Sequence, residues 1–109
     1  MREKLLNYQR MINLNTMHML GIEVTLHLYS VHSLKEKRRI IRSILDHSRH
    51  RYKVTNAEIN YLDNLSRAGL GFALVTNNLQ TAEKVLQKVI NYIDQQAEVE
   101  IIEINWLEI

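Results

Sequence analysis

The chain has 109 residues, no cysteine and no proline, and 46% of its residues are apolar. This length fits one domain, and the apolar content excludes a disordered chain. The missing cysteines exclude disulfides, zinc–thiolate sites and a cysteine nucleophile. They fit the cytoplasm, where we expect the protein. No apolar run is long enough to span a membrane, and the first residues lack the continuous apolar stretch of a signal peptide. We therefore interpret residues 1–18 as an N-terminal extension ahead of a single domain, residues 19–109.

Charge is distributed unevenly along the chain, although the formal net charge is only +2. Residues 32–53 contain eight Lys and Arg and two acidic residues, whereas residues 54–109 contain three basic and eight acidic residues. A chain polarised in this way could present its basic block to nucleic acid. The two blocks could also meet each other across an interface between copies.

The first predicted elements are a strand and a helix. Residues 21–29, GIEVTLHLY, alternate between apolar and polar side chains, which predicts a half-buried strand. A helix should follow from Ser33 to about His50, because the Ser33 side chain can cap free backbone N–H groups and Glu36 can reach back to complete a capping box. One side of this helix is predicted to face the core at 100° per residue: Leu34, Ile41, Ile44, Leu45 and Ser48.

Two further strands and a second helix follow. Residues 52–60 and 67–76 are predicted strands joined by a polar connection, and two glycines near the start of the second of these strands indicate a bulge or a close backbone approach. Asn77 or Asn78 is expected to cap the next helix. The apolar side of that helix is predicted to be buried: Ala82, Val85, Leu86, Val89, Ile90 and Ile93.

The last predicted strand covers residues 99–107. Its apolar residues change side along the strand, which predicts a bulge near Ile101 and Ile102. The complete order is strand, helix, strand, strand, helix, strand, and each strand–helix–strand crossover must be right-handed. This order predicts an α+β, ferredoxin-like βαββαβ fold, with a four-stranded antiparallel sheet and two helices on one face.

The first helix carries a band of basic residues about 100° wide on the side away from its apolar residues. The band consists of Lys35, Arg38, Arg39, Arg42 and Arg49. A solvated outer face would explain it. However, like charges within a few turns repel one another, and a helix that needs only solubility would mix signs. Since Arg can clamp phosphate bidentately, we predict that this band binds nucleic acid, and RNA in particular.

Lys37 differs from its basic neighbours because it projects onto the apolar side of the helix, near Ile44. We expect its stem to snorkel over the rim of the sheet. Alternatively, Lys37 forms a small anion site with His32 and the helix N-terminus.

Other chemistry is poorly supported by the sequence. His47 and His50 could share a metal ion with Asp46, but nothing completes the ligand set, and no P-loop, dinucleotide fingerprint or catalytic triad is present. We expect no cofactor or metal, and a binding module rather than an enzyme. The segment GLGF, residues 69–72, weakly resembles the third strand of the RNA-recognition motif, with Phe72 as its only aromatic residue. RNA should therefore be held by its phosphates rather than by stacking on the sheet.

Two segments together resemble a known family. They are HSLKEKR, residues 32–38, after an alternating strand, and AEINYLDNLSRAGLGFALVTN, residues 57–77. They are similar to the Domain of Unknown Function 503 family of YlxP-like bacterial proteins, over about residues 19–107. The first segment matches the family pattern without change. In the second, Leu62 and Leu65 stand where the family usually has Gln and Trp.

The resemblance implies a small ferredoxin-like domain, in agreement with the order of elements. It also implies a gene neighbourhood that often holds a translation initiation factor and ribosome-binding factor A, which favours ribosomal RNA or the ribosome as the partner. This is an association and not a mechanism. The resemblance carries no catalytic or ligand-binding residues over to this chain.

Three functional interpretations stay open at this point. The first is an RNA- or ribosome-associated module that acts through the basic helix. The second is a self-assembling domain, and we expect a homodimer or higher homo-oligomer through the open sheet face or the last strand. The third is an enzyme or small-anion binder that uses His32 and Lys37. One further expectation concerns the hairpin, where Glu58 and Arg67 should lie close together across adjacent strands.

Overall fold

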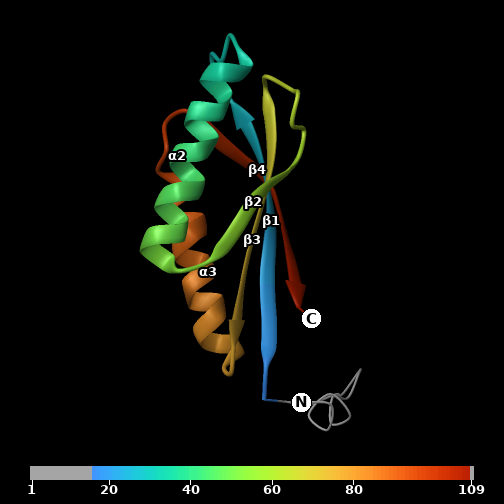
Figure 1. Cartoon of the computed structure of the whole chain (residues 1–109), viewed down its shortest axis with the longest axis vertical. Helices are drawn as coiled ribbons and strands as arrows, with labels where there is room; N and C mark the ends of the chain where they lie inside the picture. The colour runs from blue at the N-terminus through green and yellow to red at the C-terminus, as the bar shows by residue number, and fades with distance from the viewer. Residues whose placement is uncertain (1–15, 109) are drawn as a thin grey trace, which may run out of the picture.

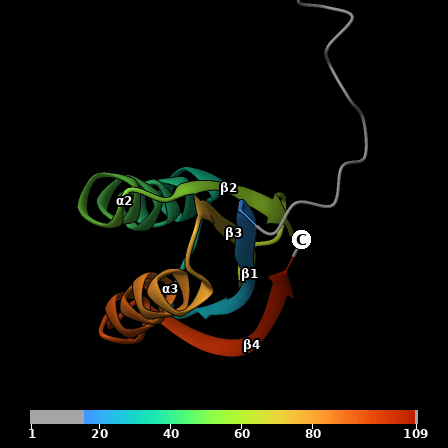
Figure 2. The same cartoon turned by 90° about the horizontal axis from the view of Figure 1, so that it is seen from below.

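The computed structural model describes residues 16–108. The elements are β1 (His18–Leu28), α2 (Leu34–Tyr52), β2 (Thr55–Asn60), β3 (Arg67–Thr76), α3 (Leu79–Asp94) and β4 (Val99–Glu108). The strands form one four-stranded antiparallel sheet in the order β2-β3-β1-β4, and both helices lie on one face of it (Figures 1 and 2). This is the predicted α+β, ferredoxin-like arrangement. The opposite sheet face, called the open face below, is covered by neither helix.

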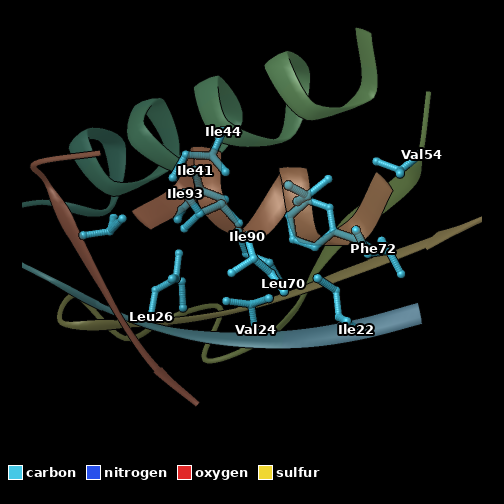
Figure 3. Close-up of a cluster of buried hydrophobic side chains, with 14 of the residues drawn as sticks. Ile22, Val24, Leu26, Ile41, Ile44, Val54, Leu70, Phe72, Ile90 and Ile93 are labelled. Atoms are coloured by element: carbon cyan, nitrogen blue, oxygen red, sulfur yellow. The ribbon is translucent and has the colours of Figure 1, made fainter. Parts of the chain in front are cut away.

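The core lies between the two helices and the inner face of the sheet (Figure 3). The alternation of β1 is as predicted, with Ile22, Val24 and Leu26 at most 1% exposed. Most of the predicted helix residues are buried, but Leu34, Leu45 and Val85 are only partly buried, and Ile40 joins the core although the predicted side of the helix did not include it. The core residues of both helices are Ile40, Ile41, Ile44, Ala82, Leu86, Val89, Ile90 and Ile93. Full burial of each aliphatic side chain contributes about 1.5–3 kcal/mol, so this core holds α2 firmly against the sheet.

The predicted bulge in the last strand is confirmed. Thr25 of β1 faces Glu103, whereas the next residue, Leu26, faces Ile101, so Ile102 is the additional residue of β4. The bulge changes the parity of the strand. As a result, apolar residues on both sides of it share the helix-covered side of the sheet.

Side chains and backbone geometry set the ends of α2. The Ser33 hydroxyl accepts a hydrogen bond from Glu36 N at 3.1 Å. The Glu36 carboxylate accepts one from His32 N at 3.4 Å, one residue earlier than the predicted capping box would place it. The helix continues two residues past the predicted end and stops at Lys53, whose left-handed φ of 59° lets its N–H bond to Arg49 O. Strand β2 consequently begins at Thr55 and not at residue 52.

Strands β2 and β3 pair as predicted, but the expected proximity of Glu58 and Arg67 is wrong. Glu58 faces Leu70, and Arg67 faces His27 of β1. The physical reason is the alternation of side chains along a strand. Leu70, which Glu58 faces, is fully buried under the helices, whereas Arg67 lies three positions away on the same strand and therefore on the open face. Glu58 and Arg67 therefore point to opposite sides of the sheet.

The glycines of β3 include the predicted close backbone approach. A Cβ atom at Gly69 would lie 2.8 Å from the Asn60 Cβ, closer than two such atoms can come. This contact stands at the register shift between Glu58 and Asn60, where β2 bulges.

The predicted extension, residues 1–18, lies mostly outside the described residues. Strand β1 begins at His18, so the last position of that segment already belongs to the sheet. Among the helices of residues 16–108, neither has the length and apolar character needed to cross a membrane.

Candidate functional site

The outer side of α2 carries the five basic residues predicted as a nucleic-acid-binding band. We call this surface the cationic face, and it consists of Lys35, Arg38, Arg39, Arg42 and Arg49. All five side chains are exposed, because the core contacts of the helix use its opposite side. The first four line one shallow depression together with Ser33, Glu36, Ser43 and Asp46. Arg49 lines an adjoining depression that Arg38 and Arg42 also reach.

The cationic face divides into paired and unpaired charges. The Arg39 guanidinium lies 3.6 Å from the Glu98 carboxylate, with both side chains more than half exposed. Arg49 lies 3.1 Å from Asp46 and also donates a hydrogen bond to the Asn56 side chain at 3.0 Å. Exposed pairs of this kind contribute little to stability.

The remaining three residues of the cationic face are Lys35, Arg38 and Arg42. Across residues 16–108, none of these three takes part in an ion pair. They lie within about two turns of one helix, so their charges repel one another and are not neutralised within the described chain.

Lys37 has the opposite environment, since its side chain is only 1% exposed. Its ammonium donates a hydrogen bond to the Tyr61 carbonyl at 2.6 Å and lies 3.1 Å from Glu58 Oε2. The snorkelling expectation is therefore wrong. The ammonium does not reach solvent, because the β2–β3 hairpin brings an acceptor and a carboxylate over the helix. Glu58 Oε2 is buried and makes no well-oriented hydrogen bond within residues 16–108, so the charge of Lys37 is what stabilises it there.

The sequence contains a signal for this ion pair, although the prediction for Lys37 did not include Glu58. Glu58 has the same strand parity as the buried Val54, which points it towards the helices. Helical periodicity likewise places Lys37 on the inner side of α2. The contact between Lys37 and Glu58, which are far apart in the sequence, forms only when α2 docks on β2. The carbonyl that accepts from Lys37 belongs to Tyr61, whose backbone has a left-handed φ of 58°.

The anion site suggested for His32 and Lys37 stays a prediction. The His32 residue is exposed and gives its backbone N–H to Glu36, as part of the cap. The Lys37 ammonium is directed to Glu58. An anion at this place would have to compete with a carboxylate that is already in contact with the ammonium.

The histidines of α2 contact aromatic and backbone groups. The His47 ring stacks on Tyr92 of α3 with centroids 3.9 Å apart, and it meets Tyr52 edge-on at 6.0 Å. His50 Nδ1 lies 2.7 Å from the Asp46 carbonyl. Burial, and to a smaller extent the nearby Tyr52, raises the pKa of Tyr92. Within the part of the chain that is described, no group of three or more His, Cys, Asp or Glu side chains could hold a metal ion.

The open face carries a different kind of surface. Phe72, the aromatic residue of the GLGF segment, is 2% exposed and belongs to the core, so it offers no ring to a base. The open face instead has an apolar hollow of about 310 Å³. Small residues line this hollow between larger apolar side chains. Its lining on the open face includes Gly21, Gly71, Ala57, Ala73, Met19, Ile59 and Leu107.

At the other end of the open face, polar groups contact one another. The Tyr29 hydroxyl donates a hydrogen bond to Glu100 at 2.8 Å, and its ring lies edge-on to His27. The hydrogen bond to Glu100 raises the pKa of Tyr29, with smaller contributions from desolvation and from the charge of Glu100.

Comparison with known sequences places the chain in a family. Residues 19–106 match the family described as "Protein of unknown function (DUF503)". The chain belongs to this family. A related member is the "Uncharacterized protein YlxP" of Bacillus subtilis (strain 168), which is 37% identical over 73 residues, covering 67% of this chain and 79% of that protein. In this DUF503 chain, residues 32–38 supply the helix cap, the buried Lys37 and part of the cationic face.

The chain is also similar to solved structures. The structure titled "Structural Genomics, protein YJCS" matches with a TM-score of 0.50 at 12% identity, and the match covers 82% of this chain and 96% of that one. The "De novo designed protein Foldit4" matches with a TM-score of 0.46 at 14% identity, over 84% and 96% of the two chains. The first of these supports the ferredoxin-like fold and nothing beyond it.

Proposed function

We propose that this protein is an RNA- or ribosome-associated binding module that acts through the cationic face of α2. One observation carries the proposal: Lys35, Arg38 and Arg42 are exposed on one side of a rigid helix, and among residues 16–108 no acidic side chain pairs with them. Phosphates of a partner would neutralise these charges and relieve their repulsion. The two arginines can hold a phosphate bidentately, which a lysine cannot do.

The proposed role is binding and not catalysis. Contacts to phosphates fix the position of a protein on a nucleic acid but carry no sequence information. The module would therefore recognise charge and shape. An RNA or ribosomal partner of this kind belongs to the cytoplasm.

Co-sedimentation with ribosomal subunits over a range of salt concentrations tests this function. The variant Arg38→Glu with Arg42→Glu should be lost from the subunit pellet at a lower salt concentration than wild type. Its matched control is Lys84→Glu with Lys88→Glu, which makes the same charge change at the same spacing on exposed positions of α3. The control should sediment like wild type if position matters and not only net charge.

Self-association without a nucleic-acid role is the alternative. The cationic face would then meet the acidic residues of β4 or its flank in a second copy, and the Arg39–Glu98 pair shows that such contacts form within one chain. An Arg38→Glu, Arg42→Glu variant that binds RNA like wild type but changes its oligomeric state would replace the first function with this one.

A homodimer or larger assembly is also proposed in its own right, because the hollow of the open face and the exposed Leu107 of β4 leave apolar surface for a second copy. Light scattering tests this directly. A monomer at high micromolar concentration would remove the proposal of self-association and leave the RNA-binding proposal unaffected.

A further inference from the structure

The charges of the cationic face form a fixed row. Helix α2 is capped at both ends and anchored by its buried Ile40, Ile41 and Ile44. From Lys35 to Arg42 the helix rises about 10 Å, and to Arg49 about 21 Å, at ~1.5 Å per residue. A rigid row of cations matches a ligand whose phosphates are also held in place. A flexible single strand would have to be ordered on the row, which costs conformational entropy.

Stacking would normally compensate a single strand for this cost. Proteins that bind single strands place aromatic side chains along the phosphate-binding groove, and each stacked base contributes about 1–3 kcal/mol. Helix α2 contains one Tyr and no Phe or Trp. That residue, Tyr52, is the last of the helix, is half-buried and contacts the His47 ring. The other rings of α2 are the imidazoles of His47, which stacks on Tyr92, and of His50. None of the five residues of the cationic face has an aromatic ring, so within that face bases have no ring on which to stack.

The open face does not provide the missing rings. Its residues on the two central strands are Met19, Gly21, Glu23, Thr25, His27, Arg67, Gly69, Gly71, Ala73 and Val75. The one ring among them, that of His27, lies edge-on to Tyr29. Glu100 and Glu103 of β4 face His27 and Thr25 in register, which adds negative charge on the same face. A phosphate backbone would be repelled there.

The exposed Trp106 lies in an equally unsuitable place. It faces Ile22 in the register of β1 and β4, on the edge of the helix-covered side. There it lines a groove between α3 and β4, with Glu83 on the helix and Glu108 on the strand. No residue of α2 lines this groove, so the Trp106 ring is not part of the cationic face.

We infer that the ligand of the cationic face is double-stranded, A-form RNA, held by its backbone phosphates, and this inference rests on the function proposed above. Double-stranded RNA is recognised mostly by shape and by contacts to phosphates and 2′-hydroxyl groups, which need no stacking. The fixed spacing of the cations and the lack of an aromatic residue among the five of the cationic face both favour such a ligand.

Fluorescence anisotropy at one fixed salt concentration tests the inference with the full chain. The probes are an RNA duplex of about 16 base pairs, a length that duplex-binding domains span, each of its separate strands, and the DNA duplex of the same sequence. We expect the RNA duplex to bind at least about tenfold more tightly than either single strand, the equivalent of one missing stacked base. The Arg38→Glu, Arg42→Glu variant should bind the duplex more weakly than wild type, and the Lys84→Glu, Lys88→Glu control should bind it like wild type. Circular dichroism shows whether both variants are folded.

The possible results separate this inference from the function on which it rests. Equal or tighter binding of the single strands overturns the duplex inference and leaves an RNA-binding function standing. Equal binding of the RNA and DNA duplexes overturns recognition of the A-form. Binding to none of the RNA probes overturns the inference, and if ribosomal subunits also fail to retain the protein, the proposed function fails with it.

Discussion

The two sides of α2 place the charges of one short basic segment in two different environments. On the outer side, Lys35, Arg38 and Arg42 are exposed, and no ion pair within residues 16–108 includes them. On the inner side, two residues from Lys35, the Lys37 side chain is 1% exposed and its ammonium contacts Glu58 and the Tyr61 carbonyl. The comparison teaches that a basic cluster in a sequence is not a single feature. Whether each charge is buried in an ion pair or is exposed to solvent depends on the side of the helix and on what packs against it.

The loss of a positive charge should change the free energy of unfolding in opposite directions on the two sides of α2. A buried ion pair is costly to form, but losing one partner is costlier, because the other charge remains buried without compensation. On the outer side, the loss of a cation reduces the repulsion between neighbouring charges and leaves no buried charge without a partner. The inner side should therefore respond to mutation in the free energy of unfolding, and the outer side in binding.

The largest effect is expected from Lys37→Ala. It leaves the buried Glu58 Oε2 without its cation and the Tyr61 carbonyl without its donor, and should lower the free energy of unfolding by about 3 kcal/mol. Urea denaturation measures this loss. The matched control is Lys35→Ala, which should change the free energy of unfolding by no more than about 0.5 kcal/mol. Equal effects of the two substitutions would remove the distinction between the two sides.

A second substitution sharpens the same comparison. Lys37→Met with Glu58→Leu removes both charges and retains apolar volume, so it should recover a large part of the roughly 3 kcal/mol lost in Lys37→Ala. Chemical denaturation again provides the measurement. If the double variant is less stable than Lys37→Ala, the Lys37–Glu58 pair itself stabilises the fold, and its role is not limited to compensating the buried charge of Glu58.

A smaller effect is expected from Ser33→Ala, which removes the side chain that accepts from Glu36 N. The lost cap should cost about 1 kcal/mol of stability. Affinity for RNA, measured where the variant is fully folded, should not change, because the cations do not depend on this hydroxyl. A large loss of affinity would assign Ser33 to the binding surface.

The smallest effect concerns the Arg39–Glu98 pair. Its side chains are 67% and 54% exposed, and Glu98→Gln should therefore change the free energy of unfolding by less than about 0.5 kcal/mol. The same substitution releases Arg39 from its acidic neighbour. RNA affinity should rise slightly, and a fall in affinity measured by anisotropy would contradict a phosphate-binding role for Arg39.

The fold could be predicted from the sequence because its main signals are local. The alternation of β1, the cap at Ser33, the apolar sides of both helices and the parity change at Ile101 and Ile102 each depend on residues close together in the chain. The local signals failed at the end of α2, where the left-handed Lys53 decides the last residue of the helix.

The candidate site was predictable only in part. The cationic face follows from helical periodicity alone. The partner of Lys37 could not be obtained in that way, because the contact joins α2 to β2 across 21 positions of the sequence and depends on the register of the β2–β3 hairpin. The stacking of His47 on Tyr92 likewise requires the packing of α2 against α3.

The most direct test of the division between the two sides of α2 is the salt dependence of RNA binding. Affinity for the RNA duplex is measured over a series of salt concentrations for wild type and for Arg38→Glu with Arg42→Glu, and the logarithm of the association constant is plotted against the logarithm of salt concentration. Each lost phosphate contact removes roughly one unit of slope, so the variant should be flatter by about two units. Its free energy of unfolding should stay within about 0.5 kcal/mol of wild type. Identical slopes and affinities for the two proteins would contradict the assignment of the outer cations to phosphate binding.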